Sequence, residues 1–450
     1  MWQLLSAAIS FIILHYLLGI GREVAHSEIV GGSISDVCTT VEELRVINYE
    51  IHPHLNRLRG SEFFRIFRVN LDRRCPFWEA EGRCITNKCT VDECETKEVP
   101  QQFKMCNQTF DVEKDLEESE MTMINSFLPN MLEDEWMRIE ENDQEAIFVN
   151  ILNNGHAWTF FNGSHIWDAI YTSSCNNTPN SNKNSGLRQD FTRNHSAKDC
   201  PENPVLYRLI SGVHANVNLH ITHNDFDLNG DPLPPNHDKY LERVGFHKER
   251  LENLFLAYSL TLQAINSLNG KVEEFSYIAD NPQADQEMKE TLHALIEDSI
   301  KVCKNPFLAD KLFEAFPKQE FIKKIKPIFY NITKILDCVT CEKCKLYGKL
   351  QFTGLTAVMK IMFGQGNESK LTRNEMVGLI NLMAKLADSV EWYFEYLEYE
   401  KTMLYKIRNA IKTEAPILLI LTLFLIYTIS QSREARPFQA PLTFLDKKHQ

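Results

Sequence analysis

Apolar positions recur at steps of three and four through the C-terminal half of the chain. This spacing predicts amphipathic helices over Leu251–Leu268, Ala284–Val302 and Ile322–Leu336. A further helix is predicted from Thr372, which can form a capping box with Glu375. The stripe of this helix that faces the core consists of Met376, Leu379, Met383, Leu386, Val390, Tyr393 and Leu397. The predicted fold class is therefore mostly α, a single helical domain with a helix-bundle core.

The N-terminal third has a different pattern. It is rich in cysteine and turn-forming residues, which predicts a cysteine-rich loop region. Residues 176–196 are dominated by Asn, Ser and Thr and indicate a long loop closed at its ends by Cys175 and Cys200. The 12 cysteines among 450 residues are too few for a small scaffold held together by disulfides. Each cysteine is therefore expected to have a specific role.

The two ends of the chain indicate the secretory pathway. The apolar run Leu4–Ile20 precedes small residues around Ser27, which predicts a signal peptide at 1–27, with an uncleaved anchor as the alternative. Ala415–Ser430 carries no charge and as a helix would cover ~24 Å, close to the thin membrane of the endoplasmic reticulum. A buried core helix is the alternative for this run.

These segments predict a signal peptide at 1–27, a lumenal domain at 28–411, a transmembrane helix at 412–430 and a cytosolic tail at 431–450. The tail ends in KKHQ, which resembles the dilysine retrieval signal of resident membrane proteins of the endoplasmic reticulum. Lumenal exposure is also indicated by six glycosylation sequons, at Asn107, Asn162, Asn176, Asn194, Asn331 and Asn367. The formal charge of -13 argues against nucleic acid as a partner.

Three cysteines at steps of three, Cys338, Cys341 and Cys344, are the first candidates for chemistry. In an oxidising lumen a C-x-x-C pair is typical of disulfide exchange, and a helix N-terminus lowers the thiol pKa. A zinc site is the alternative, but no fourth ligand is evident, so no metal is predicted. A calcium loop beginning at Asp225 fails as well, because its twelfth position is Asn236.

A second cluster, CPFWEAEGRCITNKCTVDEC, holds Cys75, Cys84, Cys89 and Cys94. Its polar, glycine-containing spacing predicts a mobile loop. Mobility is what a disulfide needs if it must reach both an external partner and a buried acceptor. The alternative is a loop held by purely structural disulfides.

Three segments together resemble the endoplasmic reticulum oxidoreductin family, the flavin-dependent oxidases of protein disulfide isomerase. They are CPFW with the C-x4-C-x4-C that includes Cys84, Cys89 and Cys94, YRLISGVHANVNLH at 207–220, and DCVTCEKCKLYGKLQFTGL at 337–355. The resemblance implies an enzyme on the lumenal side of the endoplasmic reticulum membrane. It would pass electrons from protein disulfide isomerase through a shuttle disulfide and an inner disulfide to FAD, and then to molecular oxygen to give hydrogen peroxide.

By matching position, the resemblance also implies roles for ten cysteines. They are a shuttle pair Cys84/Cys89, an inner pair Cys341/Cys344, a structural bridge Cys75/Cys338, a further disulfide Cys175/Cys200, and a pair Cys94/Cys106 that in vertebrate members takes part in regulatory reshuffling. Cys38 and Cys303 remain, and whether they pair with each other is left open.

The implied ligands of FAD are Thr159, Trp167, Ser211, His214, Arg243 and Arg250. A tryptophan offers an aromatic face to a ring, and arginines pair with a diphosphate. Taken without the family, His214 fits an ordinary buried histidine, and the two arginines fit a solvated helix face. One departure is that Ala157 stands where the family has an arginine.

The rival function is a non-enzymatic, disulfide-rich lumenal glycoprotein that binds folding partners. A zinc-bound interaction module is a third alternative.

Overall fold

The structure is a computed structural model that describes residues 40–78, 89–104, 109–111, 136–137, 143–154, 163–175, 204–224, 231–274, 277–278, 281–302, 318–364 and 370–434. The chain divides into two compact units, Met1–Trp392 and Tyr393–Gln450.

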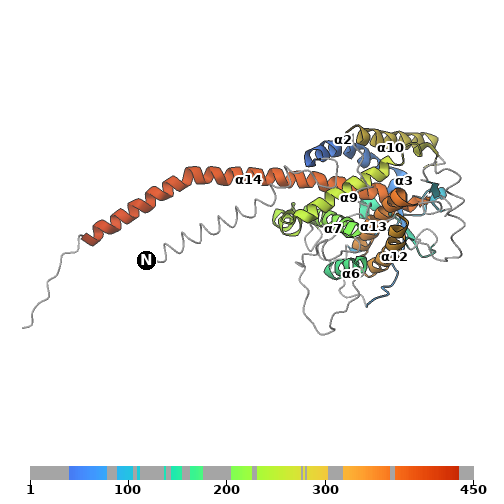
Figure 1. Cartoon of the computed structure of the whole chain (residues 1–450), viewed down its shortest axis with the longest axis horizontal. Helices are drawn as coiled ribbons and strands as arrows, with labels where there is room; N and C mark the ends of the chain where they lie inside the picture. The colour runs from blue at the N-terminus through green and yellow to red at the C-terminus, as the bar shows by residue number, and fades with distance from the viewer. Residues whose placement is uncertain are drawn as a thin grey trace, which may run out of the picture. The chain divides into compact units, whose positions relative to one another are not determined.

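Helices are the main elements of the described residues (Figure 1). They are α2 (Val41–Gly60), α3 (Glu62–Arg65), α5 (Ile151–Asn154), α6 (Ser164–Ser174), α7 (Pro204–His223), α8 (His237–Tyr240), α9 (Lys248–Asn266), α10 (Pro282–Val302), α12 (Lys318–Leu336), α13 (Glu342–Phe363) and α14 (Arg373–Glu434). Short strands form two antiparallel pairs, β1 (Ile66–Val69) with β3 (Ile147–Asn150) and β2 (Thr109–Asp111) with β4 (Lys370–Thr372). The predicted mostly α fold class is confirmed.

The helices predicted from apolar spacing are present as α9, α10 and α12, with ends that differ by a few residues. The predicted capping box is formed, since Glu375 N donates to Thr372 Oγ1 at 3.3 Å and Thr372 N donates to Glu375 Oε2 at 2.8 Å. The predicted stripe along α14 is buried, and none of its residues is more than 6 % exposed: Met376, Leu379, Met383, Leu386, Val390, Tyr393 and Leu397. The spacing therefore identified core-facing positions correctly.

Helix α2 lies in the N-terminal third, where the sequence pattern predicted a cysteine-rich loop region and no helix. It begins with a capping box in which Glu43 N donates to Thr40 Oγ1 at 3.2 Å, and it buries Leu44 and Ile47. Pro53 lies inside this helix. Because proline usually ends a helix, it conceals α2 from a search for uninterrupted helical patterns.

Two helix crossings depend on glycine. Gly354 of α13 meets Gly378 of α14, and a Cβ at Gly354 would lie 2.4 Å from the Gly378 carbonyl oxygen. Gly212 of α7 meets α9 in the same way, because a Cβ there would lie 2.2 Å from the Asn253 carbonyl oxygen. The absence of a side chain at these positions lets the helix backbones approach closely.

A chain of buried amides joins the central helices α7, α13 and α14. Asn216 Nδ2 donates to Gln351 Oε1 at 2.9 Å, and Gln351 Nε2 donates to Asn381 Oδ1 at 3.2 Å. Ser389 Oγ in turn donates to Asn216 Oδ1 at 2.7 Å. A satisfied polar network of this kind favours one relative placement of the three helices.

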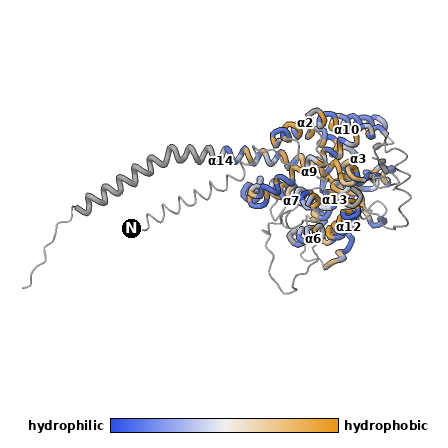
Figure 2. Tube along the Cα trace, in the orientation of Figure 1, coloured by the Kyte–Doolittle hydropathy of each residue, from blue (hydrophilic) through white to orange (hydrophobic). Residues whose placement is uncertain are grey.

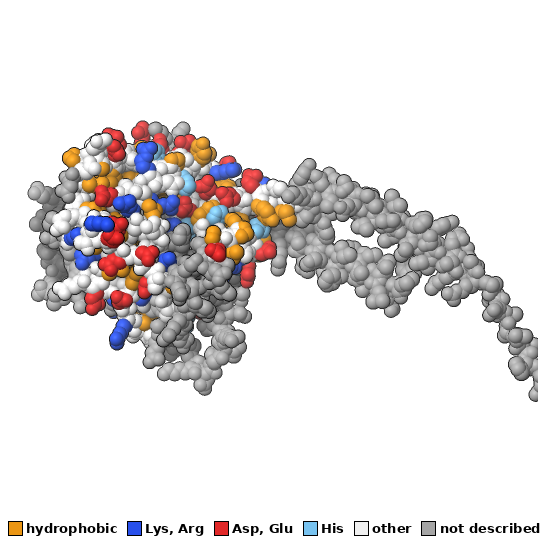
Figure 3. All heavy atoms as spheres, turned by 180° about the vertical axis from the view of Figure 1, so that it is seen from behind, with side chains coloured by type: hydrophobic (Ala, Val, Ile, Leu, Met, Phe, Trp, Pro, Cys, Tyr) orange, Lys and Arg blue, Asp and Glu red, His pale blue; other side chains and the backbone are white. Residues whose placement is uncertain are grey.

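Helices α2 and α10 lie side by side (Figure 1), and His54 Nε2 lies 2.9 Å from Asp298 Oδ2 between them. Hydrophilic residues are frequent along α10, whereas hydrophobic residues are frequent along α13 (Figure 2). On the face drawn in Figure 3, acidic and basic side chains are interspersed over the described residues. The hydrophilic character of α10 is typical of an outer helix, and the hydrophobic character of α13 is typical of a helix in the core of a bundle.

No helix whose side chains are described is long and apolar enough to cross a membrane. The transmembrane helix predicted at 412–430 lies in a part of α14 described by its backbone alone, so this finding gives it no support. The predicted signal peptide and the loop at 176–196 lie outside the described residues, as does the cytosolic tail after Glu434. The first compact unit ends at Trp392, ahead of the predicted domain boundary at residue 411.

Candidate active site

The inner pair lies at the start of α13. Cys341 occupies the N-cap position, its carbonyl oxygen accepts a hydrogen bond from Lys345 N at 2.8 Å, and its side chain is fully buried. Neither Cys341 nor Cys344 is disulfide-bonded, so both carry thiols. A hydrogen bond from the Cys344 thiol lowers the pKa of Cys341, and the backbone N–H groups of Cys344 and Lys343 act in the same direction. The C-x-x-C pair is thus a dithiol with one activated sulfur, in the direction predicted for a helix N-terminus.

The bridge Cys75–Cys338, implied by the resemblance, is present, with Cα atoms 4.3 Å apart and a sequence separation of 263 positions. Beyond Cys75, Trp78 N donates to Cys75 Sγ at 3.3 Å, and the Trp78 indole meets the His165 ring edge to face at 4.7 Å. The bridge therefore fixes the CPFW segment to the turn that precedes the inner pair.

Two buried lysines of α13 hold the backbone that leads to Cys75. Lys345 Nζ donates to Leu71 O at 2.7 Å, and Lys349 Nζ donates to Asn70 O at 2.9 Å. Lys349 also forms an ion pair with the buried Asp337 at 3.0 Å. Burial, together with the neighbouring Lys349 charge, lowers the pKa of Lys345. Both lysines lie within about two helical turns of the inner pair. Helix α13 therefore holds the backbone before Cys75 close to Cys341 and Cys344.

The segment that follows Cys89 is fixed as well. Val91 N donates to Glu342 Oε2 at 2.8 Å. Asp92 exchanges two hydrogen bonds with the Asn154 amide, at 3.1 and 3.2 Å, and Cys94 N donates to Phe148 O at 2.8 Å. The chain is therefore anchored beside α13 on both sides of the residues predicted to carry the shuttle pair.

Cys89 is buried and disulfide-bonded, and so is Cys175. The partners of these cysteines lie outside the described residues, as do the predicted partners Cys84 and Cys200, so both pairings stay predictions.

The implied pair of Cys94 with Cys106 is not formed in this structure, because Cys94 is a free thiol. Its backbone is held on strand β3, where neighbouring Glu93 forms a bridge with Val149. Burial raises the pKa of the Cys94 thiol. Cys106 lies outside the described residues.

An aromatic cluster lies where α6 and α7 meet. The rings of Trp167 and His214 stack with centroids 3.9 Å apart, and Tyr171 Oη lies 3.0 Å from His214 Nδ1. Burial raises the pKa of Tyr171, so its hydroxyl stays protonated. Phe352, two turns or about 12 Å along α13 from Cys344, lies 6.2 Å from Trp167 between ring centroids. The same helix therefore carries the inner pair and contacts this cluster.

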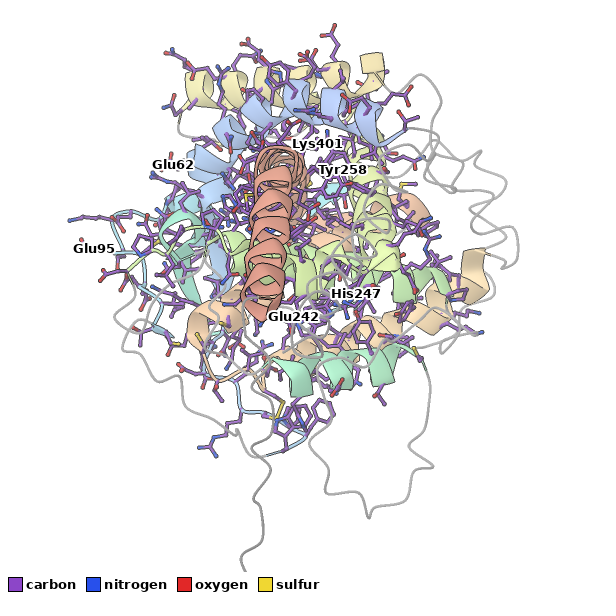
Figure 4. All side chains as sticks on the ribbon, turned by 90° about the vertical axis from the view of Figure 1, so that its left-hand side faces the viewer. Glu62, Glu95, Glu242, His247, Tyr258 and Lys401 are labelled. Atoms are coloured by element: carbon purple, nitrogen blue, oxygen red, sulfur yellow. A yellow bond between two sulfur atoms is a disulfide. The ribbon has the colours of Figure 1, made fainter. Side chains whose placement is uncertain are left out.

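The two implied arginines lie at a break between α8 and α9. Arg243 is part of a short π-helix, Leu241–Gly245, and its carbonyl oxygen accepts a hydrogen bond from Arg250 Nη1. The break is held by His247 Nε2, 2.9 Å from Glu242 O, and Figure 4 labels both residues. π-Helical turns are frequent at functional sites.

Burial lowers the pKa of Arg250, against the opposing effects of the neighbouring Tyr171, Tyr207 and Glu249. The nearby Ser211 hydroxyl is buried and hydrogen-bonds to Tyr171. A half-buried guanidinium suits a diphosphate, and the Trp167–His214 stack supplies aromatic surface. These residues fit FAD. The other implied ligand, Thr159, and the departure at Ala157 lie outside the described residues.

No three His, Cys, Asp or Glu side chains in the described segments converge in a way that could hold a metal ion. Asn236, the twelfth position of the rejected calcium loop, is the N-cap of α8 and accepts a hydrogen bond from Lys239 N at 2.9 Å.

Among the sequons, Asn331 alone lies within the described residues. Its Nδ2 donates to Ser173 Oγ at 2.8 Å between α12 and α6, and Thr333 of the sequon is buried. A glycan on Asn331 would replace this contact. Modification at Asn331 and at the other five sequons stays a prediction.

Sequence reasoning did not identify Glu342, Asn154 or Tyr171 as parts of the site. Tyr171 lies four residues after Trp167, and this spacing on a helix places both side chains on one face. That signal was available in the sequence. The partners of Glu342 and Asn154 are backbone groups far away along the chain, which no local pattern shows.

Comparisons with known proteins agree with one another. A sequence model described as Endoplasmic Reticulum Oxidoreductin 1 (ERO1) matches residues 50–393. Endoplasmic reticulum oxidoreductin-1 of Arabidopsis thaliana is 30% identical over 384 residues, which cover 80% of this chain and 78% of that protein. ERO1-like protein alpha of Homo sapiens is 28% identical over 421 residues, covering 80% and 89%. The solved "Structure of Ero1p, Source of Disulfide Bonds for Oxidative Protein Folding in the Cell" is similar with a TM-score of 0.55 and 25% identity, over 81% of this chain and 99% of that one.

Proposed function

Because the chain belongs to the endoplasmic reticulum oxidoreductin family, we propose that it is a thiol oxidase that reoxidises protein disulfide isomerase and delivers the electrons to oxygen as hydrogen peroxide. The observation that carries this proposal is the Cys341/Cys344 dithiol at the N-terminus of α13. The lowered pKa of Cys341 favours its thiolate, which is the nucleophile of disulfide exchange.

In the proposed reaction a Cys84–Cys89 disulfide takes two electrons from a dithiol of the isomerase, which becomes a disulfide. The Cys84/Cys89 dithiol then reduces a Cys341–Cys344 disulfide and is itself reoxidised. Two electrons and two protons have moved to the inner pair. Each 30 mV by which such a transfer runs uphill costs about 1.4 kcal/mol for two electrons, so the shuttle disulfide cannot be much more reducing than the isomerase.

The described residues that would hold FAD are Trp167, Ser211, His214, Arg243 and Arg250. When bound, FAD would supply the two-electron acceptor and the reactivity with oxygen that protein disulfides lack. Within this set, the Tyr171 hydroxyl holds His214 Nδ1 at 3.0 Å and so fixes the orientation of the imidazole against Trp167. Thr159 would complete the set.

We place this activity on the lumenal side of the endoplasmic reticulum; the names of the relatives support the endoplasmic reticulum itself. The proposed partner is protein disulfide isomerase, because a redox-active dithiol is the substrate that the shuttle pair requires.

An absorbance spectrum and an oxygen electrode test the proposal. We expect the purified full chain to show flavin bands and to consume oxygen when reduced isomerase is added. Cys341→Ser should abolish oxygen uptake and keep the flavin bands. A colourless protein after flavin supplementation, without oxygen uptake, would favour the non-enzymatic glycoprotein instead.

A further inference from the structure

The segment that leaves the shuttle pair touches the helix of the inner pair at a defined point. Val91 N donates to Glu342 Oε2 at 2.8 Å, although 251 positions separate the two residues in sequence. Val91 follows Cys89 by two residues, and Glu342 directly follows Cys341. The contact therefore joins the two redox pairs through residues that are themselves not redox-active.

The next residues of this segment form hydrogen bonds with α5 and β3 and not with α13. The backbone of Asp92 is bound by Asn154 of α5, and Cys94 N is bound by Phe148 O of β3. The hydrogen bond from Val91 N to Glu342 is the contact of this segment that involves α13. A carboxylate at the first position of a helix is also favoured by the helix dipole, which helps to hold Glu342 in place.

We propose that Glu342 is a positioning residue that keeps the Cys89 side of the shuttle close to the Cys341/Cys344 pair during exchange between the two pairs. Two residues of extended chain span at most about 7 Å. Fixing Val91 therefore restricts the volume that Cys89 can sample, which raises its effective concentration at the inner pair. This inference rests on the proposed function.

Glu342 does not itself react in the proposed exchange. The exchange itself forms the Cys84–Cys89 disulfide, breaks the Cys341–Cys344 disulfide, and moves two electrons and two protons inward. Removing the carboxylate should slow this transfer and leave the intrinsic reactivity of the inner pair unchanged. A role confined to helix stability would instead lower folding stability without changing the rate per folded molecule.

The test is single-turnover transfer in the oxidised full chain. Stoichiometric reduced isomerase is added without oxygen, samples are quenched by alkylation, and the peptide with Cys341 and Cys344 is followed by mass spectrometry. Glu342→Ala should slow reduction of the inner pair about tenfold, as expected for loss of one hydrogen bond to a charged group. Glu342→Gln keeps an acceptor and should restore most of the rate. Glu290→Ala is the matched control, since Glu290 accepts one side-chain hydrogen bond on the exposed surface of α10.

Two further measurements separate the explanations. In a Cys84→Ala background, a small dithiol reduces the inner pair directly, and Glu342→Ala should leave that rate unchanged. Slowing there as well would overturn the positioning role in favour of an effect on Cys341. Hydrogen exchange in the peptide around Val91 should accelerate in Glu342→Ala. Should this variant fail to fold, Val91→Pro removes the donor instead and should slow transfer equally.

Equal transfer rates in folded Glu342→Ala and wild type would overturn the proposal. A wild type that consumes no oxygen and carries no flavin would instead overturn the proposed function. If the proposed function fails in this way, hydrogen exchange around Val91 that is the same in Glu342→Ala and wild type would also show that Glu342 does not hold this segment in place.

Discussion

The indole of Trp167 lies almost parallel to the imidazole of His214, with 18° between the ring planes and 3.9 Å between the centroids. The two rings come from different helices, α6 and α7, and Tyr171 of α6 holds the imidazole through its hydroxyl. The packing of α6 against α7 therefore fixes the orientation of the two rings. A fixed aromatic surface of this kind suits the proposed flavin site.

We expect His214→Ala to lower the ratio of flavin to protein at least severalfold, because it removes one ring of the stack. Tyr171→Phe should have a smaller effect, since it removes only the hydrogen bond to Nδ1. Absorbance of the purified variants measures both. The matched control is His223→Ala, because His223 lies on the same helix and stacks on Trp392 at 4.1 Å. If His223→Ala lost as much flavin as His214→Ala, then removing any histidine ring from α7 would lower flavin binding, and the stack with Trp167 would have no special role.

Substitutions of the two cysteine pairs should have different consequences. Cys84→Ala or Cys89→Ala should abolish oxidation of the isomerase and leave part of the oxidation of a small dithiol, which can reach the inner pair directly. Cys341→Ala or Cys344→Ala should stop oxygen consumption with every substrate. Oxygen uptake with both substrates measures this division. Equal loss on both substrates in Cys84→Ala would contradict separate roles for the two pairs.

The sequence predicted the parts of this molecule that depend on local pattern. Periodic apolar residues identified α9, α10, α12 and the start of α14, and the spacing of Cys341 and Cys344 indicated a helix N-terminus. What it missed depends on tertiary contact. Helix α2 was concealed by Pro53, and the glycine crossings depend on how close two backbones come.

The site shows the same division. Cys75 and Cys338 were assigned through a family resemblance, and their bridge is present, whereas the implied Cys94/Cys106 pair is not formed here. Pairing of cysteines depends on redox state as well as on position, and sequence records position alone. The contact of Glu342 with Val91 could not be predicted, because a backbone N–H has no sequence signature.

Gly354→Ala should destabilise the chain, because its methyl group would lie 2.4 Å from the Gly378 carbonyl oxygen. We expect a loss of about 1 to 3 kcal/mol in the free energy of unfolding, the usual cost of an overpacked core. Gly60→Ala is the control, since nothing lies within 4 Å of a Cβ there. Denaturant unfolding followed by circular dichroism measures both variants. Similar midpoints for the two would contradict the close crossing of α13 and α14.

The His52–Asp388 pair predicts a pH dependence of stability. His52 Nε2 lies 3.0 Å from Asp388 Oδ1, and Arg59 and Glu391 also face this pair. The hydrogen bond to Asp388 raises the pKa of His52 above its usual value of 6.5, against the opposing effect of burial. A raised folded pKa means that this contribution is complete below about pH 6.5 and is lost as the pH rises through the folded pKa.

The measurement for this pair is the free energy of unfolding at pH 6 and pH 8. Wild type should lose stability over this interval, and His52→Ala should lose less. At pH 6 the variant should be less stable by about 1 kcal/mol, the size expected for a partly exposed ion pair. His293→Ala is the control, because His293 pairs with Glu273 at the surface and its side chain is 38% exposed. Parallel pH profiles for wild type and His52→Ala would contradict the assignment.

Because Cys94 is not disulfide-bonded, it can compete for a cysteine of the proposed shuttle pair and so regulate the activity. Cys84, Cys89 and Cys94 are evenly spaced, so the loop-closure costs of a Cys84–Cys89 and a Cys89–Cys94 disulfide should be nearly equal. If the Cys94 thiolate attacks Cys89 of the Cys84–Cys89 disulfide, a Cys89–Cys94 disulfide forms and Cys84 is released as a thiol. A disulfide between Cys84 and Cys106 then forms when the proposed Cys341–Cys344 disulfide accepts the two electrons and two protons of these thiols, and the shuttle is switched off. Burial raises the pKa of Cys94, which keeps its thiolate fraction low and should make this capture slow at neutral pH.

We therefore expect oxidised wild type to consume oxygen only after a lag when reduced isomerase is added, while the alternative bonds are reduced. Cys106→Ala and Cys94→Ser should show no lag, since neither can hold the alternative pairing. Return to the inactive form after the substrate is exhausted should be faster at pH 8.5 than at pH 7, because the thiolate fraction of Cys94 rises with pH. An oxygen electrode follows all three proteins. Identical time courses for wild type and both variants would leave Cys94 and Cys106 without a regulatory role.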